Sequence, residues 1–266
     1  MISDLHTHSV FCDGRNTLEE MVLAAIDIGL PAIGISGHGH TDFDTSYCIN
    51  DMPGYIKTAR ALQEKYKKDI QVYVGIEEES GSPMHRQDFD YIIGSSHYVI
   101  KDGVRYSVDG SPAHYQMCLA QFKNDPIQLA HAYYAPFCEY IVSRKPDIVG
   151  HFDLLTKFDE VGTSHYFDNP EYNRIAESYI DQASRSGCLF EVNTGVISRG
   201  YRTTPYPYAN LLQVLKKNGN GIVLNSDSHS VETLTFRFEE TRLFLKDIGF
   251  GHIYALYNGE FVKDYL

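Results

Sequence analysis

The sequence opens with Met1-Ile-Ser-Asp-Leu-His-Thr-His-Ser-Val-Phe-Cys-Asp-Gly14, and this stretch decides how the rest of the chain is interpreted. Residues 2–5 predict a short buried strand. His6 and His8 follow at a spacing of two, so both imidazoles point to one side of an extended backbone. With Asp13 nearby, these donors suit a borderline divalent metal such as Zn, Mn or Fe. An isolated pair of this kind is more often exposed or hydrogen-bonded, so the interpretation depends on the pattern recurring along the chain.

The composition is that of an ordinary globular protein. The chain has 266 residues, 43% of them hydrophobic and 22% charged, with a formal net charge of −12. This charge argues against non-specific binding to nucleic acid or to an anionic membrane, but bound divalent cations would still admit an anionic substrate. Five cysteines without paired spacing predict reduced thiols and a cytoplasmic location. Neither a signal peptide nor an apolar run of about 18 residues is found. The oligomeric state is not predicted.

Strands and helices alternate along the whole chain. Further strands are predicted at 32–36, 70–76, 91–94, 148–151, 188–193 and 221–225, with a closing extended segment at 252–257. Helices are predicted at 17–28, 51–68, 109–122, 126–143, 170–186, 208–218 and 236–248, and a loop over the strand ends at 195–207. Seven or so such units without a linker predict a single α/β domain over 1–266, with its parallel sheet closed into a barrel. An open doubly wound sheet is the alternative, but no Gly-x-Gly-x-x-Gly follows the first strand.

Metal-ligand residue types recur where the predicted strands end. They are His6, His8, His38, Glu77, His97, His151, Asp227 and His229. The C-terminal ends of barrel strands converge on one face, where active sites lie. A random scatter would not place a ligand-type residue at nearly every strand end, so the joint pattern predicts a metal site on that face.

The motifs at these positions resemble those of the polymerase-and-histidinol-phosphatase (PHP) family. They are Asp4-Leu-His-Thr-His8, the histidine that follows Ile35-Ser36, Gly75-Ile-Glu77, Ser96-His97, Gly150-His151 and Ser226-Asp-Ser-His229. The resemblance extends from residue 4 to residue 229. It implies a distorted (β/α)7 TIM-like barrel that holds three divalent metal ions and hydrolyses phosphate esters.

The resemblance also implies which residues bind each ion. The implied groups are His6, His8, Glu77 and Asp227 for the first ion; Glu77, His97 and His151 for the second; and Asp13, His38 and His229 for the third. Glu77 would bridge the first two ions.

Within the family, the chain is most similar to the histidinol-phosphate phosphatase branch. The similar segments are Phe11-Cys12, Gly150-His-Phe-Asp-Leu-Leu-Thr-Lys-Phe158, Glu191-Val-Asn-Thr194, Arg199-Gly200 and Tyr206-Pro207. This similarity implies hydrolysis of L-histidinol phosphate to L-histidinol and phosphate, a step of histidine biosynthesis. Two departures stand out: Gly37 replaces a frequent Asp before the metal-binding histidine, and the segment after Asn193 differs, which puts the position of a phosphate-binding arginine in doubt.

A mechanism follows as a hypothesis. A hydroxide that bridges two metal ions attacks phosphorus in line with the departing alkoxide. Arg199 is the first candidate for a phosphate-binding cation, followed by Lys157 and Arg202. The leaving oxygen takes its proton from the group formed by Asp13, His38 and His229, within which Asp13 or a metal-bound water is the better acid than a metal-bound histidine.

Three alternatives to this reaction stay open. A related phosphoesterase would act on another small ester or on a nucleotide, for which Tyr201 and Arg202 offer a stacking loop. A metal-dependent amidohydrolase would often carry a bridging modified lysine, but no lysine lies at a suitable strand end. A non-catalytic barrel would have lost ligands, and here no ligand position is lost.

Overall fold

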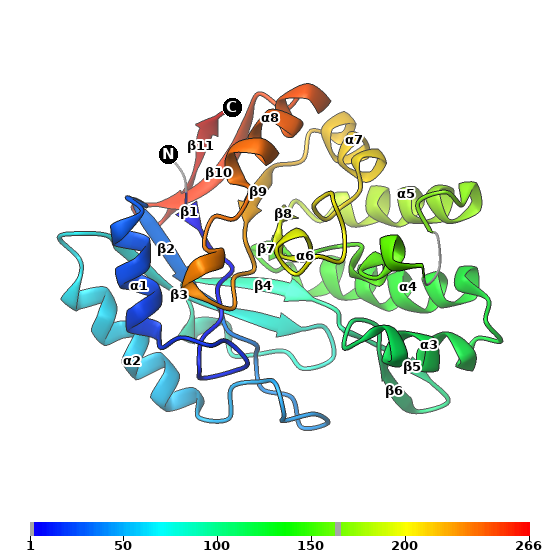
Figure 1. The fold of residues 1–266 in the computed structure, drawn as a ribbon, viewed down its shortest axis with the longest axis horizontal. Helices are drawn as coiled ribbons and strands as arrows, with labels where there is room; N and C mark the ends of the chain where they lie inside the picture. Colours follow the sequence, from blue (N-terminus) through cyan, green and yellow to red (C-terminus); the bar gives the residue numbers. More distant parts are fainter. Residues whose placement is uncertain (1–2, 163–165) are drawn as a thin grey trace.

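The computed structural model describes residues 3–162 and 166–266, which form a curled sheet with helices outside it (Figure 1). The strands are β1 (Ser3–Asp4), β2 (Ala32–Ile35), β3 (Gln71–Glu79), β4 (Tyr91–Ser95), β5 (Tyr98–Lys101), β6 (Val104–Ser107), β7 (Ile148–Val149), β8 (Leu189–Asn193), β9 (Ile222–Asn225), β10 (His252–Tyr257) and β11 (Glu260–Tyr265). All except β5 and β6 belong to one sheet, in chain order from β1 to β11. Ile2, predicted to start the first strand, lies outside the described residues.

The seven predicted barrel strands run parallel to one another, from β1 across to β9. The sheet curls so far that the segment after β1 pairs with the segment after β9. A parallel bridge joins Thr7 to Ser228, and the His8 amide donates to the Ser228 carbonyl at 2.8 Å. The Leu5 amide donates to Asn225 Oδ1 at 3.0 Å. These bonds join the first and the seventh parallel strands, and they confirm the distorted TIM-like barrel.

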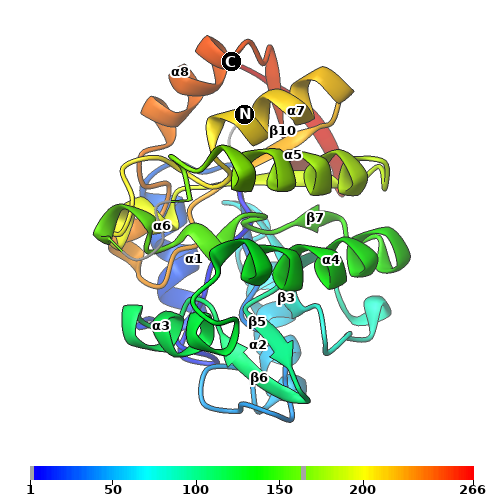
Figure 2. The same ribbon diagram turned by 90° about the vertical axis from the view of Figure 1, so that its right-hand side faces the viewer.

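The helices cover the outside of the sheet. They are α1 (Leu18–Asp27), α2 (Met52–Lys65), α3 (Pro112–Gln121), α4 (Pro126–Arg144), α5 (Pro170–Ser184), α6 (Gly195–Ser198), α7 (Ala209–Asn218) and α8 (Phe238–Ile248). In Figure 2, α4, α5 and α7 lie side by side on one flank, whereas α1 and α2 cover the opposite flank. No described helix is both long and apolar enough to cross a bilayer.

Helix starts follow the capping signals of the sequence. Thr17 and Glu20 form a capping box at α1, with the Thr17 amide donating to the Glu20 carboxylate at 2.7 Å. Asp125 and Asn169 accept backbone amides at the starts of α4 and α5, each directly before a proline. The main helices therefore begin within a few residues of their predicted positions.

Two hairpins and one short helix depart from the prediction. The pair β5–β6 was not predicted, and β11 adds an antiparallel strand to a sheet expected to be parallel. Their turns are Asp102-Gly103 and Asn258-Gly259, and all four residues have positive φ. Such turns favour two-residue hairpins, so the sequence carried a signal for both. The short helix α6 lies in the predicted loop 195–207.

A tyrosine fills the inside of the barrel below the strand ends. The Tyr91 hydroxyl donates to the Leu5 carbonyl across the interior. A Cβ on Gly34 would lie 2.1 Å from the Tyr91 hydroxyl oxygen, and a Cβ on Gly75 would lie 2.2 Å from its Cζ. Glycine at both positions therefore makes room for this ring, which forms the floor beneath the polar strand ends.

Candidate metal centre

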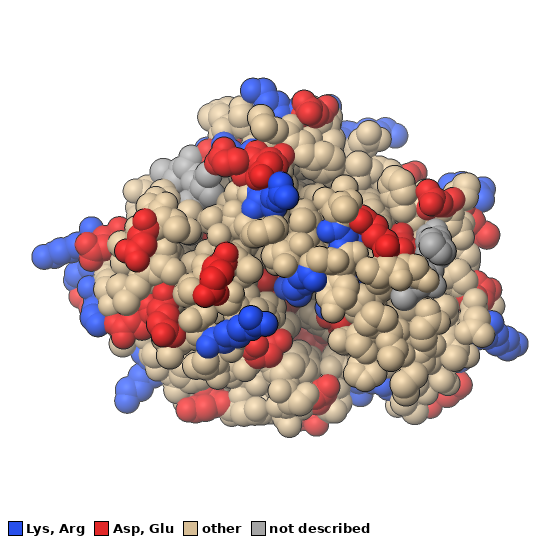
Figure 3. Space-filling view, in the orientation of Figure 1, with Lys and Arg blue, Asp and Glu red and all other residues tan. Residues whose placement is uncertain are grey.

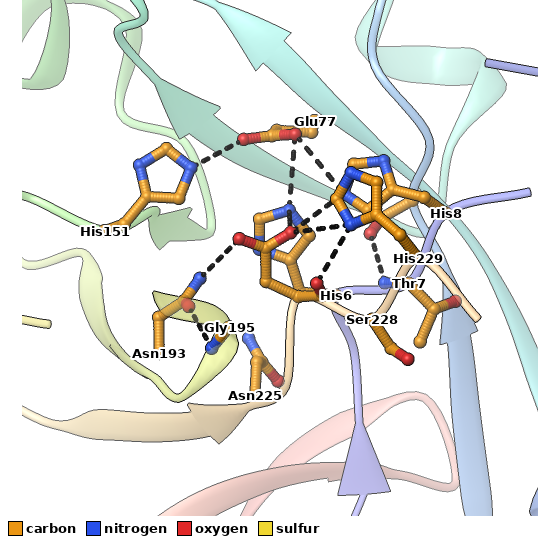
Figure 4. A network of polar contacts seen from close by, with 12 residues as sticks. His6, Thr7, His8, Glu77, His151, Asn193, Gly195, Asn225, Ser228 and His229 are labelled. Atoms are coloured by element: carbon orange, nitrogen blue, oxygen red, sulfur yellow. Dashed lines mark hydrogen bonds and ion pairs between the residues drawn. The ribbon is translucent and has the colours of Figure 1, made fainter. Parts of the chain in front are cut away.

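His6 and His8 leave β1 as predicted, and both side chains point to one side of the chain (Figure 4). Neither side chain is exposed to solvent. His6 Nε2 lies 3.3 Å from Glu77 Oε2, and His8 Nε2 lies 3.2 Å from Asp227 Oδ1. The bridge between Thr7 and Ser228 holds the backbone between them, so the strand pairing itself fixes the two imidazoles.

Glu77 occupies the middle of the site, near the end of β3. Its Oε2 lies 2.8 Å from His38 Nδ1, in addition to the contact with His6. Its Oε1 lies 2.9 Å from His151 Nε2 and 3.4 Å from His97 Nε2. Burial opposes ionisation, but His38 and the other imidazoles hold the pKa of Glu77 well below its usual range. Since His8 Nε2 also lies 3.7 Å from Oε2, one ionised carboxylate faces five imidazoles, as suits a bridging ligand.

A second group of donors lies toward solvent. Asp13 Oδ2 lies 3.3 Å from His229 Nε2, and Asp13 Oδ1 lies 3.6 Å from His38 Nε2. The side chains of Asp13 and His229 are 36% and 28% exposed, whereas the inner ligands are buried. Burial of the carboxyl opposes ionisation, but His38 and His229 lower the pKa of Asp13 well below its usual range. This outer group is the part of the site that a substrate would meet first.

The donor atoms fit divalent metal ions. Among the described residues, four overlapping groups bring their ligand atoms within 4.8 Å of one another: His8, Asp13, His38 and His229; His6, Glu77 and His151; His6, His8 and Asp227; and His38, Glu77 and His97. The buried atoms that have no hydrogen-bond partner include His6 Nε2, His8 Nε2 and Glu77 Oε2. Buried polar atoms without partners are costly, and a cation between them would satisfy all three. Nitrogen and carboxylate donors of this kind suit zinc, manganese or iron.

All nine predicted ligands lie in these groups, although the groupings differ from the predicted sets. His8 joins Asp13, His38 and His229, and His38 also approaches Glu77. The structure therefore brings the predicted residues together, while the assignment of individual ligands to individual ions stays a prediction.

Two carboxylates orient the ligand imidazoles from behind. Glu191 Oε1 lies 2.7 Å from His6 Nδ1, and Glu191 Oε2 accepts the His151 amide at 2.8 Å. Glu79 Oε2 lies 2.9 Å from His97 Nδ1. A carboxylate on the second ring nitrogen fixes both the tautomer and the ring orientation. The sequence analysis did not assign Glu191 this role, although a carboxylate inside the apolar strand β8 was a signal for it.

Three consecutive carboxylates end β3, and they face different ways. Glu77 and Glu79 serve the metal centre. Glu78 points to the opposite side, where Arg144 Nε and Nη2 each donate to its carboxylate at 2.8 Å and Tyr140 donates at 2.6 Å. The alternation of a strand thus separates two ligand-side carboxylates from a structural one.

Gly37 stands where the family often has Asp, and the side chain of Cys12 fills the space beside it. A Cβ at this position would lie 2.9 Å from Cys12 Sγ. The same sulfur lies 3.6 Å from His8 Nδ1. Cys12 therefore stands beside the ligand histidine in space that a side chain at position 37 would need.

The three predicted substrate-binding cations have different surroundings. Arg199 Nη2 donates to Asp227 Oδ2 at 2.8 Å, so this arginine supports a ligand. Arg202 is fully buried, 3.5 Å from Asp153 Oδ2 and stacked on Tyr208 at 3.6 Å from the ring centroid. Lys157 lines the cavity described below. The role of each cation in binding substrate stays a prediction.

A cavity of about 510 Å³ adjoins the metal centre. Its lining includes Asp13, His38 and His97 from the ligand set, together with Lys157 and Arg105. In Figure 3, Lys and Arg atoms lie around the hollow in the middle of the same face, with acidic atoms among them. The cavity therefore joins clustered metal-ligand donors to cationic side chains, an arrangement suited to a phosphorylated ligand.

Comparison with known proteins agrees with this geometry. A sequence profile of the PHP domain matches residues 4–195, which is most of the chain. The chain belongs to the PHP domain family.

Several similar proteins are named as histidinol phosphatases. A Schizosaccharomyces pombe protein named as a probable histidinol-phosphatase is 24% identical, with 96% of this chain and 89% of that protein covered. A Listeria monocytogenes structure named as a histidinol phosphatase has a TM-score of 0.78 at 22% identity and covers 90% of this chain and 99% of that one. The Lactococcus lactis histidinol phosphate phosphatase, solved with zinc, L-histidinol and phosphate, has a TM-score of 0.66 at 19% identity, with coverages of 98% and 99%. Both structures share the fold of this chain.

Proposed function

We propose that this chain is a phosphomonoesterase that uses three divalent transition-metal ions, zinc, manganese or iron, to hydrolyse L-histidinol phosphate to L-histidinol and phosphate. The observation that carries the proposal is the convergence of nine ligand-type side chains beside one cavity in a member of the PHP family. The substrate is supported by relatives named as histidinol phosphatases over nearly the whole chain, and by the Lactococcus lactis structure that holds zinc, L-histidinol and phosphate.

The chain's own residues hold the ions and keep their ligands in place. When bound, the ions neutralise phosphate charge and lower the pKa of a coordinated water so that it becomes a nucleophile near neutral pH. Glu77 is placed to bridge, because both of its oxygens face imidazole nitrogens. Glu191 and Glu79 keep His6 and His97 oriented toward the ions.

The cavity side of the site handles the substrate. Lys157 presents its ammonium group to the cavity and can donate to a phosphate oxygen. Arg199 acts on the metal side instead, where it holds the carboxylate of the ligand Asp227 in place. Asp13 lies at the partly exposed edge, with His229 Nε2 3.3 Å from its Oδ2 and His38 beside it, so Asp13 or a water held by this group would pass on the proton that the leaving oxygen needs.

Steady-state hydrolysis of L-histidinol phosphate, compared with a panel of other phosphomonoesters and nucleotides, tests this function. We expect a kcat/KM of at least about 10⁴ M⁻¹s⁻¹ for histidinol phosphate, well above the rest of the panel. Similar activity across the panel would retain a metal phosphatase but reject this substrate. Bound metal without phosphatase activity would reject the function.

A further inference from the structure

Asp109 lies on the wall of the cavity beside a metal ligand, although no role was assigned to it. It follows β6 at the point where the hairpin returns to the site. The Val108 amide donates to the His97 carbonyl at 3.0 Å, so the residue before Asp109 is tied directly to a ligand histidine. The predicted helix 109–122 begins only at Pro112, which leaves Asp109 outside the helix and in the cavity lining.

Lys157 forms an ion pair with Asp109 inside the same cavity. Its Nζ donates to the Asp109 carbonyl at 2.7 Å and to Oδ2 at 3.2 Å. Ser107 Oγ donates to Oδ1 at 3.2 Å. The two charged side chains are 12% and 21% exposed, and this remaining exposure is toward the cavity that they line. A carboxylate and an ammonium group therefore stand next to each other within reach of a ligand in the cavity.

Asp109 is an anion at neutral pH. Burial opposes its ionisation, but Lys157 and His97 hold the pKa of this carboxyl at about 2. Asp44 is the other aspartate of the cavity outside the ligand groups, and its oxygens accept hydrogen bonds from Ser46 and from the Tyr98 hydroxyl. Asp109 differs from it in standing beside the Lys157 ammonium and directly after the residue that bonds to His97. Asp109 is therefore the better placed of the two to receive a substrate cation close to the metal centre.

The charges of the Asp109–Lys157 pair are complementary to those of one class of phosphate ester. In a 2-aminoalkyl phosphate, the carbon that carries the ammonium is bonded to the carbon that carries the ester oxygen. A cation and an anion then lie a few ångströms apart in the substrate, as they do in the wall. Each wall charge faces its opposite when the phosphate lies toward Lys157 and the metal centre.

We propose that Asp109 selects 2-aminoalkyl phosphates by accepting hydrogen bonds from the substrate ammonium, while Lys157 donates to the neighbouring phosphate. This inference rests on the proposed function, because L-histidinol phosphate belongs to that class of ester. Asp109 is thus a specificity residue, and the reacting atoms are handled by the metal centre.

Two esters that differ only in the amine separate this role from a structural one. Hydrolysis of L-histidinol phosphate is compared with that of 3-(imidazol-4-yl)propyl phosphate, which lacks the amine. We expect the unmodified chain to prefer the amino ester by about 10- to 100-fold in kcat/KM, the range of one charge-assisted hydrogen bond. Asp109→Asn should abolish this preference by lowering kcat/KM for the amino ester alone, with metal content and melting temperature unchanged.

Three further variants sharpen the test. Asp44→Asn, in the wall of the same cavity, should leave the preference intact. Lys157→Met should lower kcat/KM for both esters together, because both carry the phosphate. Asp109→Glu should restore part of the preference, since it retains the charge.

The outcomes separate this inference from the proposed function. If the unmodified chain hydrolyses histidinol phosphate but Asp109→Asn loses activity equally on both esters, the role of Asp109 is overturned and the function is retained. The same holds if the preference for the amino ester survives the substitution. Failure of the unmodified chain to hydrolyse either ester overturns both.

Discussion

The two sides of the proposed active site are built differently. The metal-ligand side comes from the ends of parallel strands, and the side chains of His6, His8 and Glu77 are not exposed at all. The cavity side comes from a hairpin and connecting loops, where Asp109 and Lys157 keep part of their surface exposed. Strand pairing fixes the first side, whereas the second can change without altering the sheet. We infer that the ends of the barrel strands carry the chemistry and that the connections between strands select the substrate.

The largest effect is expected at the bridging carboxylate. Glu77→Gln removes the charge that faces five imidazoles, so we expect kcat to fall by at least about 10³-fold with loss of bound metal. Metal content by mass spectrometry and steady-state kinetics measure both. Glu78→Gln is the matched control, because Glu78 is the next residue and its carboxylate binds Arg144 on the other face of the strand. Normal metal content and activity in Glu77→Gln would rule out the bridging role.

The floor of the barrel should be the next most sensitive place. Gly75→Ala places a Cβ against the ring of Tyr91, so we expect a loss of about 3 kcal/mol in the free energy of unfolding. Gly251→Ala, where a Cβ meets no atom within 4 Å, should change this free energy by less than about 0.5 kcal/mol. Denaturant unfolding of both variants measures these free energies. Equal free energies of unfolding for the two variants would show that the floor is not close-packed.

A smaller effect is expected behind the ligands. Glu191→Gln weakens the partner of His6 without removing a ligand, so metal affinity should fall by about 10- to 100-fold. Titration against a metal buffer measures this change. Glu171→Gln, at the exposed start of α5, is the control. Unchanged affinity in the Glu191 variant would show that His6 is held by strand pairing alone.

The affinity for metal should decrease as the pH is lowered. Burial disfavours the imidazolium forms, but neighbouring carboxylates raise the pKa values of His6 and His97 well above the ordinary value in the metal-free chain. A metal must displace these protons, so its affinity should fall as pH falls, by about tenfold per pH unit for each proton displaced. Zinc titrations at pH 6 and pH 8 test this, and equal affinities would contradict it.

The difference between the two sides also explains what the sequence predicted. His6, Glu77 and His151 each directly follow or end a predicted apolar strand, so parallel topology alone brings them to one face. Glu191 escaped notice because it lies inside a strand, and only the curl of the sheet places it behind His6. The outcome shows that strand-end residues are predictable from periodicity, while their supporting partners depend on tertiary packing.

The cavity wall was less predictable for a physical reason. The hairpin β5–β6 had a local signal in its Asp-Gly turn, but no periodicity tells where that hairpin lies relative to the barrel. Arg199 and Arg202 lie in a loop where cations are usually solvated, yet both are held by aspartates from other segments. Contacts of this kind join distant segments, so they emerge only from the folded chain.

The most direct test of the account is the metal content of the chain purified without chelator, measured together with the phosphatase activity before and after chelation. The account predicts about three divalent transition-metal ions per chain, loss of activity when they are removed, and recovery when zinc, manganese or iron is restored. Full activity in a chain that holds no metal would contradict it.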